Sequence, residues 1–146
     1  MRTSGGTVWD IRQAHPDAQV YATTAIEGAL VGFLGRNRAQ ADKILADPKT
    51  PPAQKAQILR GRSVIDNPDR LRATRPVTQS ATMTIAGRQL DVRVAPFAVS
   101  EADIWLYDPE TKLAIVGDLV VDIVPFMDTA CPDGWARALD AVEQTE

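Results

Sequence analysis

Residues 81–94, ATMTIAGRQLDVRV, decide the fold of this chain. Over Leu90–Val94 the apolar residues alternate with an aspartate and an arginine. This period of two is typical of a half-buried β-strand, because successive side chains point to opposite faces of a sheet. The pair Ala86-Gly87 separates this run from Ala81–Ala86, so the stretch predicts a β-hairpin.

The residues after this hairpin predict a second one, followed by a helix. Asp103–Tyr107 and Lys112–Val116 flank a turn at residues 108–111 that contains proline. Leu119–Val124 is a further apolar run. Pro132 stands where a missing N–H has no effect at the start of a helix, and the residues behind it form one apolar face: Trp135, Ala138, Leu139 and Val142.

The residues before the hairpin are mostly helical in pattern. A helix is expected from Thr7 to His15, and a short strand at 19–23. Thr24 and Glu27 have the spacing of a capping box, and the helix behind them continues to Leu45 with a possible bend at Gly35. Its core-facing residues are Ile26, Ala29, Leu30, Phe33, Leu34, Ala41, Ile44 and Leu45.

Another helix begins at Pro51-Pro52, and the polar residues 61–77 are expected to be a connection. The order of elements is thus helix, strand, helices, four or five strands and a final helix. It predicts an α/β (α+β) fold with helices packed on a mixed sheet. With 146 residues, the chain is expected to form a single domain, 1–146.

Composition excludes several classes of protein. One histidine and one cysteine cannot supply the three or four ligands that zinc usually takes, and one cysteine forms no intrachain disulfide. No apolar stretch approaches the length of a membrane span, so no membrane partner is expected. The first ten residues show no apolar core of a secretory signal, and the compartment stays open.

Charge is unevenly distributed. Residues 1–75 hold 12 basic and 7 acidic side chains, a net charge of +5, whereas residues 101–146 hold 2 basic and 11 acidic ones, a net charge of −9. The basic segment 55–75 does not favour nucleic-acid binding, because no aromatic residue interleaves its cations. A solvated surface, neutralised by the acidic third within the fold or across a dimer, is the preferred interpretation. Those cations are Lys55, Arg60, Arg62, Arg70, Arg72 and Arg75.

Three stretches together resemble the metallo-β-lactamase-fold hydrolases. Residues 4–23 are similar to the glycine turn, helix and "PDAxVYAT"-like strand that follow the HxHxDH zinc motif of that superfamily. Residues 98–109 resemble its "H-T-x-x-D" stretch, and residues 113–120 its "GDlv" strand, which ends in a metal-bridging aspartate. The resemblance covers nearly the whole chain. It implies a partial αββα sandwich and, for the parent class, zinc-dependent hydrolysis of amide, ester or thioester bonds.

The departures from the family pattern concern the metal ligands. The HxHxDH motif and the last zinc-binding histidine are expected to lie before residue 1 and beyond residue 146. Val99 stands at the position of another zinc-binding histidine. Only Asp118 matches a family ligand, so no zinc is expected from this chain alone. Asp122 and Asp128 are auxiliary carboxylates that, with Asp118, would offer oxygen ligands to a hard cation such as Mg²⁺.

Each of these residues also has a purely structural interpretation. In this interpretation Asp118 is a carboxylate that caps a loop. His15 is a cationic side chain at the end of a helix, and Cys131 is a buried or capping residue rather than a nucleophile. The three tryptophans, Trp9, Trp105 and Trp135, are interpreted mainly as packing residues.

Two functions from different classes are expected. The first is a truncated or degenerate metallo-β-lactamase-fold hydrolase that is inactive or poor in metal by itself. The alternative is a non-catalytic binding or oligomerisation module that keeps the scaffold. Because half a sandwich leaves sheet surface uncovered, the expected partner is a second copy or a complementing chain. A third hypothesis, cation or RNA binding through residues 55–75, is the weakest.

Overall fold

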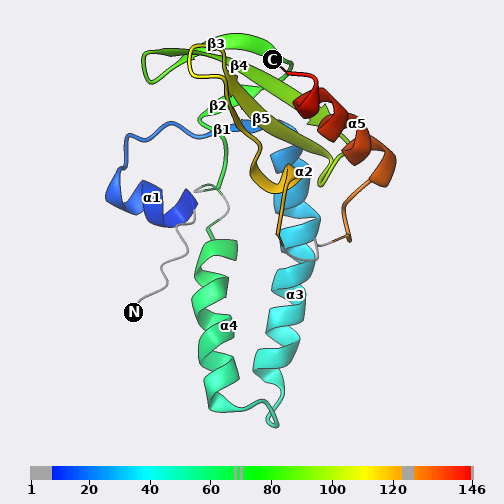
Figure 1. Ribbon diagram of the computed structural model, residues 1–146. Helices are drawn as coiled ribbons and strands as arrows, with labels where there is room; N and C mark the ends of the chain where they lie inside the picture. Colours follow the sequence, from blue (N-terminus) through cyan, green and yellow to red (C-terminus); the bar gives the residue numbers. More distant parts are fainter. Residues whose placement is uncertain (1–7, 68, 70, 123–126, 146) are drawn as a thin grey trace. The chain divides into compact units, whose positions relative to one another are not determined.

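A computed structural model describes residues 8–67, 69, 71–122 and 127–145 (Figure 1). The chain divides into two compact units, Met1–Arg75 and Pro76–Glu146, which are described separately. Helices and sheets are both present, so the α/β class predicted from the sequence is confirmed. The expectation of a single domain depends on how the two units associate, and it stays a prediction.

The first unit is mainly helical. It contains α1 (Val8–Ala14), β1 (Tyr21–Thr23), α2 (Ala25–Val31), α3 (Phe33–Ala46) and α4 (Pro52–Ile65). Just before β1, the carbonyl of Val20 accepts the N–H groups of Thr74 and Arg75, at 2.9 and 3.0 Å. Thr74 and Arg75 lead into β2 (Arg75–Val77), which forms a two-stranded sheet with β1.

The long helix predicted behind Thr24 is two helices. The break lies at Gly32, whose N–H donates to the Gly28 carbonyl at 2.7 Å, and α3 continues through Gly35, where a bend was expected. The capping box is also wrong, because the Thr24 side chain makes no capping hydrogen bond. Only the backbone carbonyl of Thr24 accepts, from the N–H of Glu27 at 3.2 Å.

The predicted connection at 61–77 is partly wrong as well. Helix α4 runs on to Ile65, and Arg75–Val77 form β2. Glycine and polar residues at 61–63 interrupt the apolar pattern of α4 before its end. One of them, Arg62, faces carboxylates of α3 and of the residue after α4, as described below.

The second unit contains a four-stranded antiparallel sheet in the order β3-β4-β5-β6. Its strands are β3 (Ala81–Ile85), β4 (Arg88–Pro96), β5 (Ala102–Asp108) and β6 (Leu113–Ile115). Both predicted hairpins are confirmed. The first turns at Ala86 and Gly87, which have φ values of 51° and 80°, as a tight two-residue hairpin turn requires.

The apolar run predicted at Leu119–Val124 forms no strand over its described residues. Leu119 ends a short 3₁₀ helix, η2 (Gly117–Leu119), and residues 123 and 124 lie outside the described part of the chain.

The C-terminal helix α5 (Pro132–Glu143) is confirmed, and it packs on one face of the sheet. The sheet contributes alternate residues of β4 and β5, which belong to one face because neighbours in a strand point to opposite sides. Trp105, 3% exposed, lies on this face, out of phase with Ile104 and Leu106 as its sequence position suggested. The buried cluster consists of Ala95, Ala98, Trp105, Tyr107, Leu119 and Ala138.

The opposite face of the sheet is mainly apolar, and it also carries the ion pair between Arg88 of β4 and Asp108 of β5. The register pairs Val92 with Leu106, and Leu106 with Ile115, so these residues share that face. Val92 is fully buried, whereas Leu113 and Ile115 on the edge strand β6 are 58% and 52% exposed. The residues of this apolar face are Ala81, Met83, Ile85, Leu90, Val92, Val94, Ile104, Leu106, Leu113 and Ile115.

Among the described residues, no helix combines the length and the apolar character that crossing a membrane requires.

Candidate functional site

The residues selected by the resemblance lie at one end of the four-stranded sheet. Val99 is in the loop between β4 and β5, and Asp118 follows β6. Since β5 and β6 are antiparallel, the start of β5 and the end of β6 are at the same end of the sheet. The sheet topology therefore places the Val99 loop and the segment that contains Asp118 at the same end of the strands.

Val99 is packed, and its loop is held by hydrogen bonds. Its side chain is half-buried against the apolar cluster under α5. Its carbonyl accepts the hydroxyl of Thr129 at 3.0 Å, and the carbonyl of Ala98 accepts the N–H of Cys131 at 2.9 Å. Ser100 donates both its N–H and its hydroxyl to the Asp103 carboxylate, each at 2.8 Å. The polar groups of the loop are thus bonded to each other and to the segment that precedes α5.

Asp118 is an exposed residue of η2. The element is anchored by its neighbour Leu119, which is buried and whose carbonyl accepts the indole N–H of Trp135 at 2.9 Å. Asp122 and Asp128 are also exposed. Within the described residues, no three histidine, cysteine, aspartate or glutamate side chains are grouped so that they can hold a metal ion.

Cys131 and His15 occupy positions close to those expected. Cys131 is a free, half-buried thiol at the N-cap of α5, and its side chain makes no capping hydrogen bond. His15 follows α1 and is exposed, with its backbone N–H bonded to the Ile11 carbonyl at 2.7 Å. Among the described residues, the side chains of His15 and Cys131 make no hydrogen bond or ion pair, and neither belongs to a group that could hold a metal ion.

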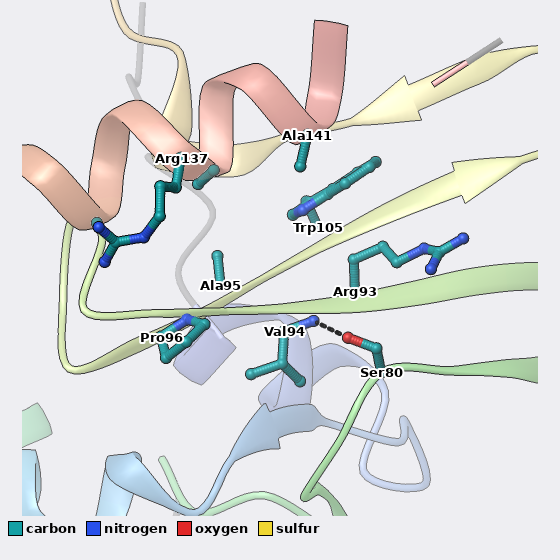
Figure 2. A pocket seen from close by; sticks show the side chains of 10 residues that line it. Ser80, Arg93, Val94, Ala95, Pro96, Trp105, Arg137 and Ala141 are labelled. Carbon is teal, nitrogen blue, oxygen red and sulfur yellow. Dashed lines mark hydrogen bonds between the residues drawn. The ribbon is translucent and has the colours of Figure 1, made fainter. Parts of the chain in front are cut away.

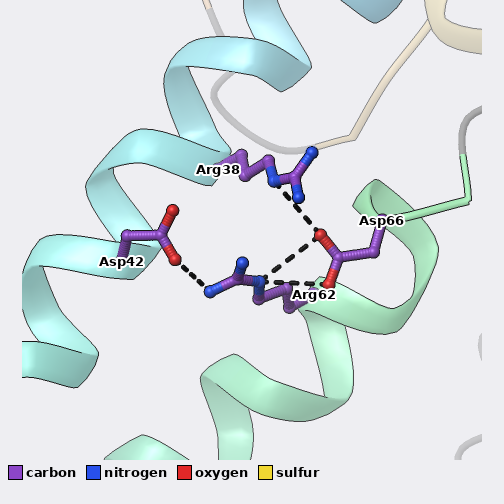
Figure 3. A network of polar contacts seen from close by, with 4 residues as sticks. All are labelled: Arg38, Asp42, Arg62 and Asp66. Atoms are coloured by element: carbon purple, nitrogen blue, oxygen red, sulfur yellow. Dashed lines mark hydrogen bonds and ion pairs between the residues drawn. The ribbon is translucent and has the colours of Figure 1, made fainter.

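Two arginines of the basic segment 55–75, Arg62 and Arg72, pair with carboxylates of the first unit, and Arg70 lies outside the described residues. Figure 3 shows Arg62 of α4 between Asp42 of α3 and Asp66, with Arg38 of α3 also bonded to Asp66. Burial lowers the pKa of Arg62, but the two carboxylates outweigh it and raise the pKa above its ordinary value. Arg72 pairs with Glu27 and Asp69. These ion pairs favour the interpretation of segment 55–75 as a solvated surface over that of a nucleic-acid-binding site.

A buried carboxylate lies in the turn between β5 and β6. Asp108 is 4% exposed, pairs with Arg88 of β4, and accepts the N–H groups of Glu110 and Thr111 at 3.0 and 3.4 Å. Burial raises its pKa, but hydrogen bonds from Thr111 and Glu110 and the charge of Arg88 outweigh burial. The pKa of Asp108 is therefore below its ordinary value.

A pocket between α5 and the sheet is a feature that the sequence did not indicate. It has a volume of about 240 Å³ and lies wholly within the second unit. Figure 2 shows Arg93 of β4 and Arg137 of α5 on its two sides, with Trp105 between them in this view. The remaining lining residues are Ser80, Val94, Ala95, Pro96, Gly134, Ala138 and Ala141.

A comparison with protein-family models, curated proteins and solved structures finds no match for this chain. The resemblance to the metallo-β-lactamase-fold hydrolases therefore stays a hypothesis, supported by the sequence stretches quoted above.

Proposed function

We propose that this chain is a degenerate metallo-β-lactamase-fold scaffold that does not hydrolyse substrates by itself. The observation that supports this most directly is the packing of Val99. At the position where the resemblance expects a zinc-binding histidine, an apolar side chain lies against the core and offers no donor atom.

The residues present do not fit a zinc ion. A catalytic zinc site needs three protein ligands, drawn mostly from histidine, cysteine and carboxylates. Asp118 is the single family ligand that the resemblance assigns, and no suitable group of three surrounds it in the described part of the chain. A hydrolytic site depends on a firmly held cation that activates water, so no hydrolytic step is derived for this chain.

Elemental analysis of protein purified without chelator tests this proposal. We expect far less than one zinc per chain, and no hydrolysis of amide, ester or thioester substrates with or without added zinc. The matched variant Val99→His restores one ligand only, and we expect it to remain without stoichiometric zinc. One zinc per wild-type chain, or zinc-dependent turnover, would contradict the proposal.

A second role, self-association with another copy of this chain, is favoured by the apolar face of the sheet. Leu113 and Ile115 expose apolar side chains on an edge strand, and an exposed apolar edge of a sheet favours association with another chain. The uneven charge also favours pairing, because the first 75 residues of one copy (+5) would attract residues 101–146 of another (−9). Size-exclusion chromatography with light scattering should give the mass of a dimer or a larger assembly. A monomer at micromolar concentration would contradict this role.

A further inference from the structure

We propose that the pocket between α5 and the sheet binds a small organic carboxylate with an apolar body. The inference goes beyond the proposed function and does not depend on whether the chain hydrolyses anything. It rests on two residues, Trp105 and Arg137, that line the same pocket and whose donor groups have no partner among the described residues.

The first donor is the indole N–H of Trp105. The Trp105 side chain is almost completely buried, yet its indole N–H has no hydrogen-bond partner among the described residues. Every fully buried side-chain nitrogen or oxygen in that part of the chain has a partner, so this N–H still reaches open space. Figure 2 shows the nitrogen end of the ring turned into the pocket. A buried tryptophan usually satisfies its N–H, as Trp135 does with the carbonyl of Leu119.

The second donor is the guanidinium of Arg137. It makes no ion pair or hydrogen bond within the described chain, although it is one turn from Asp133 in α5. Arg93, directly opposite Trp105 in the register, already pairs with Asp91 at 3.1 Å. Arg137 is therefore the cation available to a ligand, and arginine binds carboxylates through two parallel hydrogen bonds.

The rest of the pocket determines the class of ligand. None of its described lining residues is acidic, and the Ser80 hydroxyl oxygen already accepts the N–H of Val94 at 2.9 Å. The polar groups that remain are donors, which favours an anion. The other surfaces are apolar: Ala95, Pro96, Ala138, Ala141 and the ring of Trp105. Since 240 Å³ is below the usual range for drug-sized ligands, the occupant is small.

NMR of the ¹⁵N-labelled full chain, with phenylacetate as the probe, tests the proposal. We expect millimolar phenylacetate to shift the indole N–H resonance of Trp105 downfield and saturably. The indole of Trp135 should not move, because Leu119 already accepts its proton. Phenylacetamide, the neutral analogue, and inorganic phosphate, an anion without an apolar body, should leave the Trp105 resonance in place.

A pair of charge variants identifies the cation. Arg137→Gln should raise the Kd for phenylacetate by about tenfold or more, since it removes a charge-assisted hydrogen bond. Lys112→Gln removes one positive charge from the exposed turn after β5 and should change the Kd by less than about twofold. Both residues are exposed, so both variants should fold. The proposal fails if phenylacetate does not shift Trp105, if the amide or phosphate shifts it equally, or if Arg137→Gln binds as the wild type does.

Discussion

Gly134 lies where the first turn of α5 meets the chain just after β4. A Cβ built at this residue would overlap the carbonyl oxygen of Phe97 and approach that of Pro96 to 3.3 Å. Backbone atoms cannot move aside as a flexible side chain can, so α5 would have to shift away from the sheet. We predict that Gly134→Ala destabilises the fold by about 3 kcal/mol, as overpacking does. Urea unfolding measures this. The control Gly35→Ala, in open space within α3, should instead be neutral or stabilising by about 0.5–1 kcal/mol.

Asp108 gives the fold a specific dependence on pH. Because its pKa is lowered in the folded chain, its contribution to stability is present above the ordinary carboxylate pKa and is lost as the pH falls through the folded value. Asp108→Asn should therefore lower Tm clearly at pH 7, and the difference in Tm from the wild type should shrink as the pH falls below the ordinary carboxylate pKa. Glu110→Gln changes an exposed carboxylate of the same turn and is the control. A gap that stays constant with pH would assign the effect of Asp108→Asn to shape rather than charge.

At the scale of elements, helices α3 and α4 are joined by unequal ion pairs. Arg62 pairs with Asp42 and Asp66, whereas Arg38 pairs with Asp66 alone and is more exposed. We predict that Arg62→Gln lowers the stability of the helical unit more than Arg38→Gln does. The difference should decrease at high salt, because salt screens pairs that are open to solvent. Circular dichroism at 222 nm during urea unfolding measures both variants, and equal effects would contradict this ranking.

The sequence predicts those helices and strands whose pattern of apolar residues and turn residues lies within the element itself. The strands of both hairpins follow from alternation and from turn residues such as Ala86-Gly87, and α5 follows from Pro132 and its apolar face. The end of α4 was missed because glycine and polar residues at 61–63 interrupt its apolar pattern, and the contact of Arg62 with Asp42 joins residues 20 apart in the sequence. The break at Gly32 was misplaced to Gly35, since both glycines lie within the same apolar pattern.

The candidate site was predictable only in part. Sequence alone named Val99 and Asp118, and the antiparallel register explains why both lie at one end of the sheet. It could not find the pocket, because Trp105 and Arg137 are 32 residues apart and line the same pocket only because α5 packs on the sheet. The interpretation of Trp105 as a packing residue is confirmed by its burial, but the lack of a partner for its N–H among the described residues is a property of the fold and has no sequence signature.

At the scale of the whole molecule, we predict that copies associate through the exposed edge of the apolar face, Leu113 and Ile115 on β6. If two copies pair through it, charges placed on β6 must be buried without partners, which opposes association. We predict that the double variant Leu113→Lys and Ile115→Lys shifts the assembly to monomer. Both side chains are more than half exposed, so the substitutions should leave the fold of one copy intact. The matched control Gln89→Lys adds a charge to an exposed residue on the other face of the sheet and should keep the wild-type mass. Light scattering measures all three proteins, and a double variant that keeps the wild-type assembly would place the interface elsewhere on the chain.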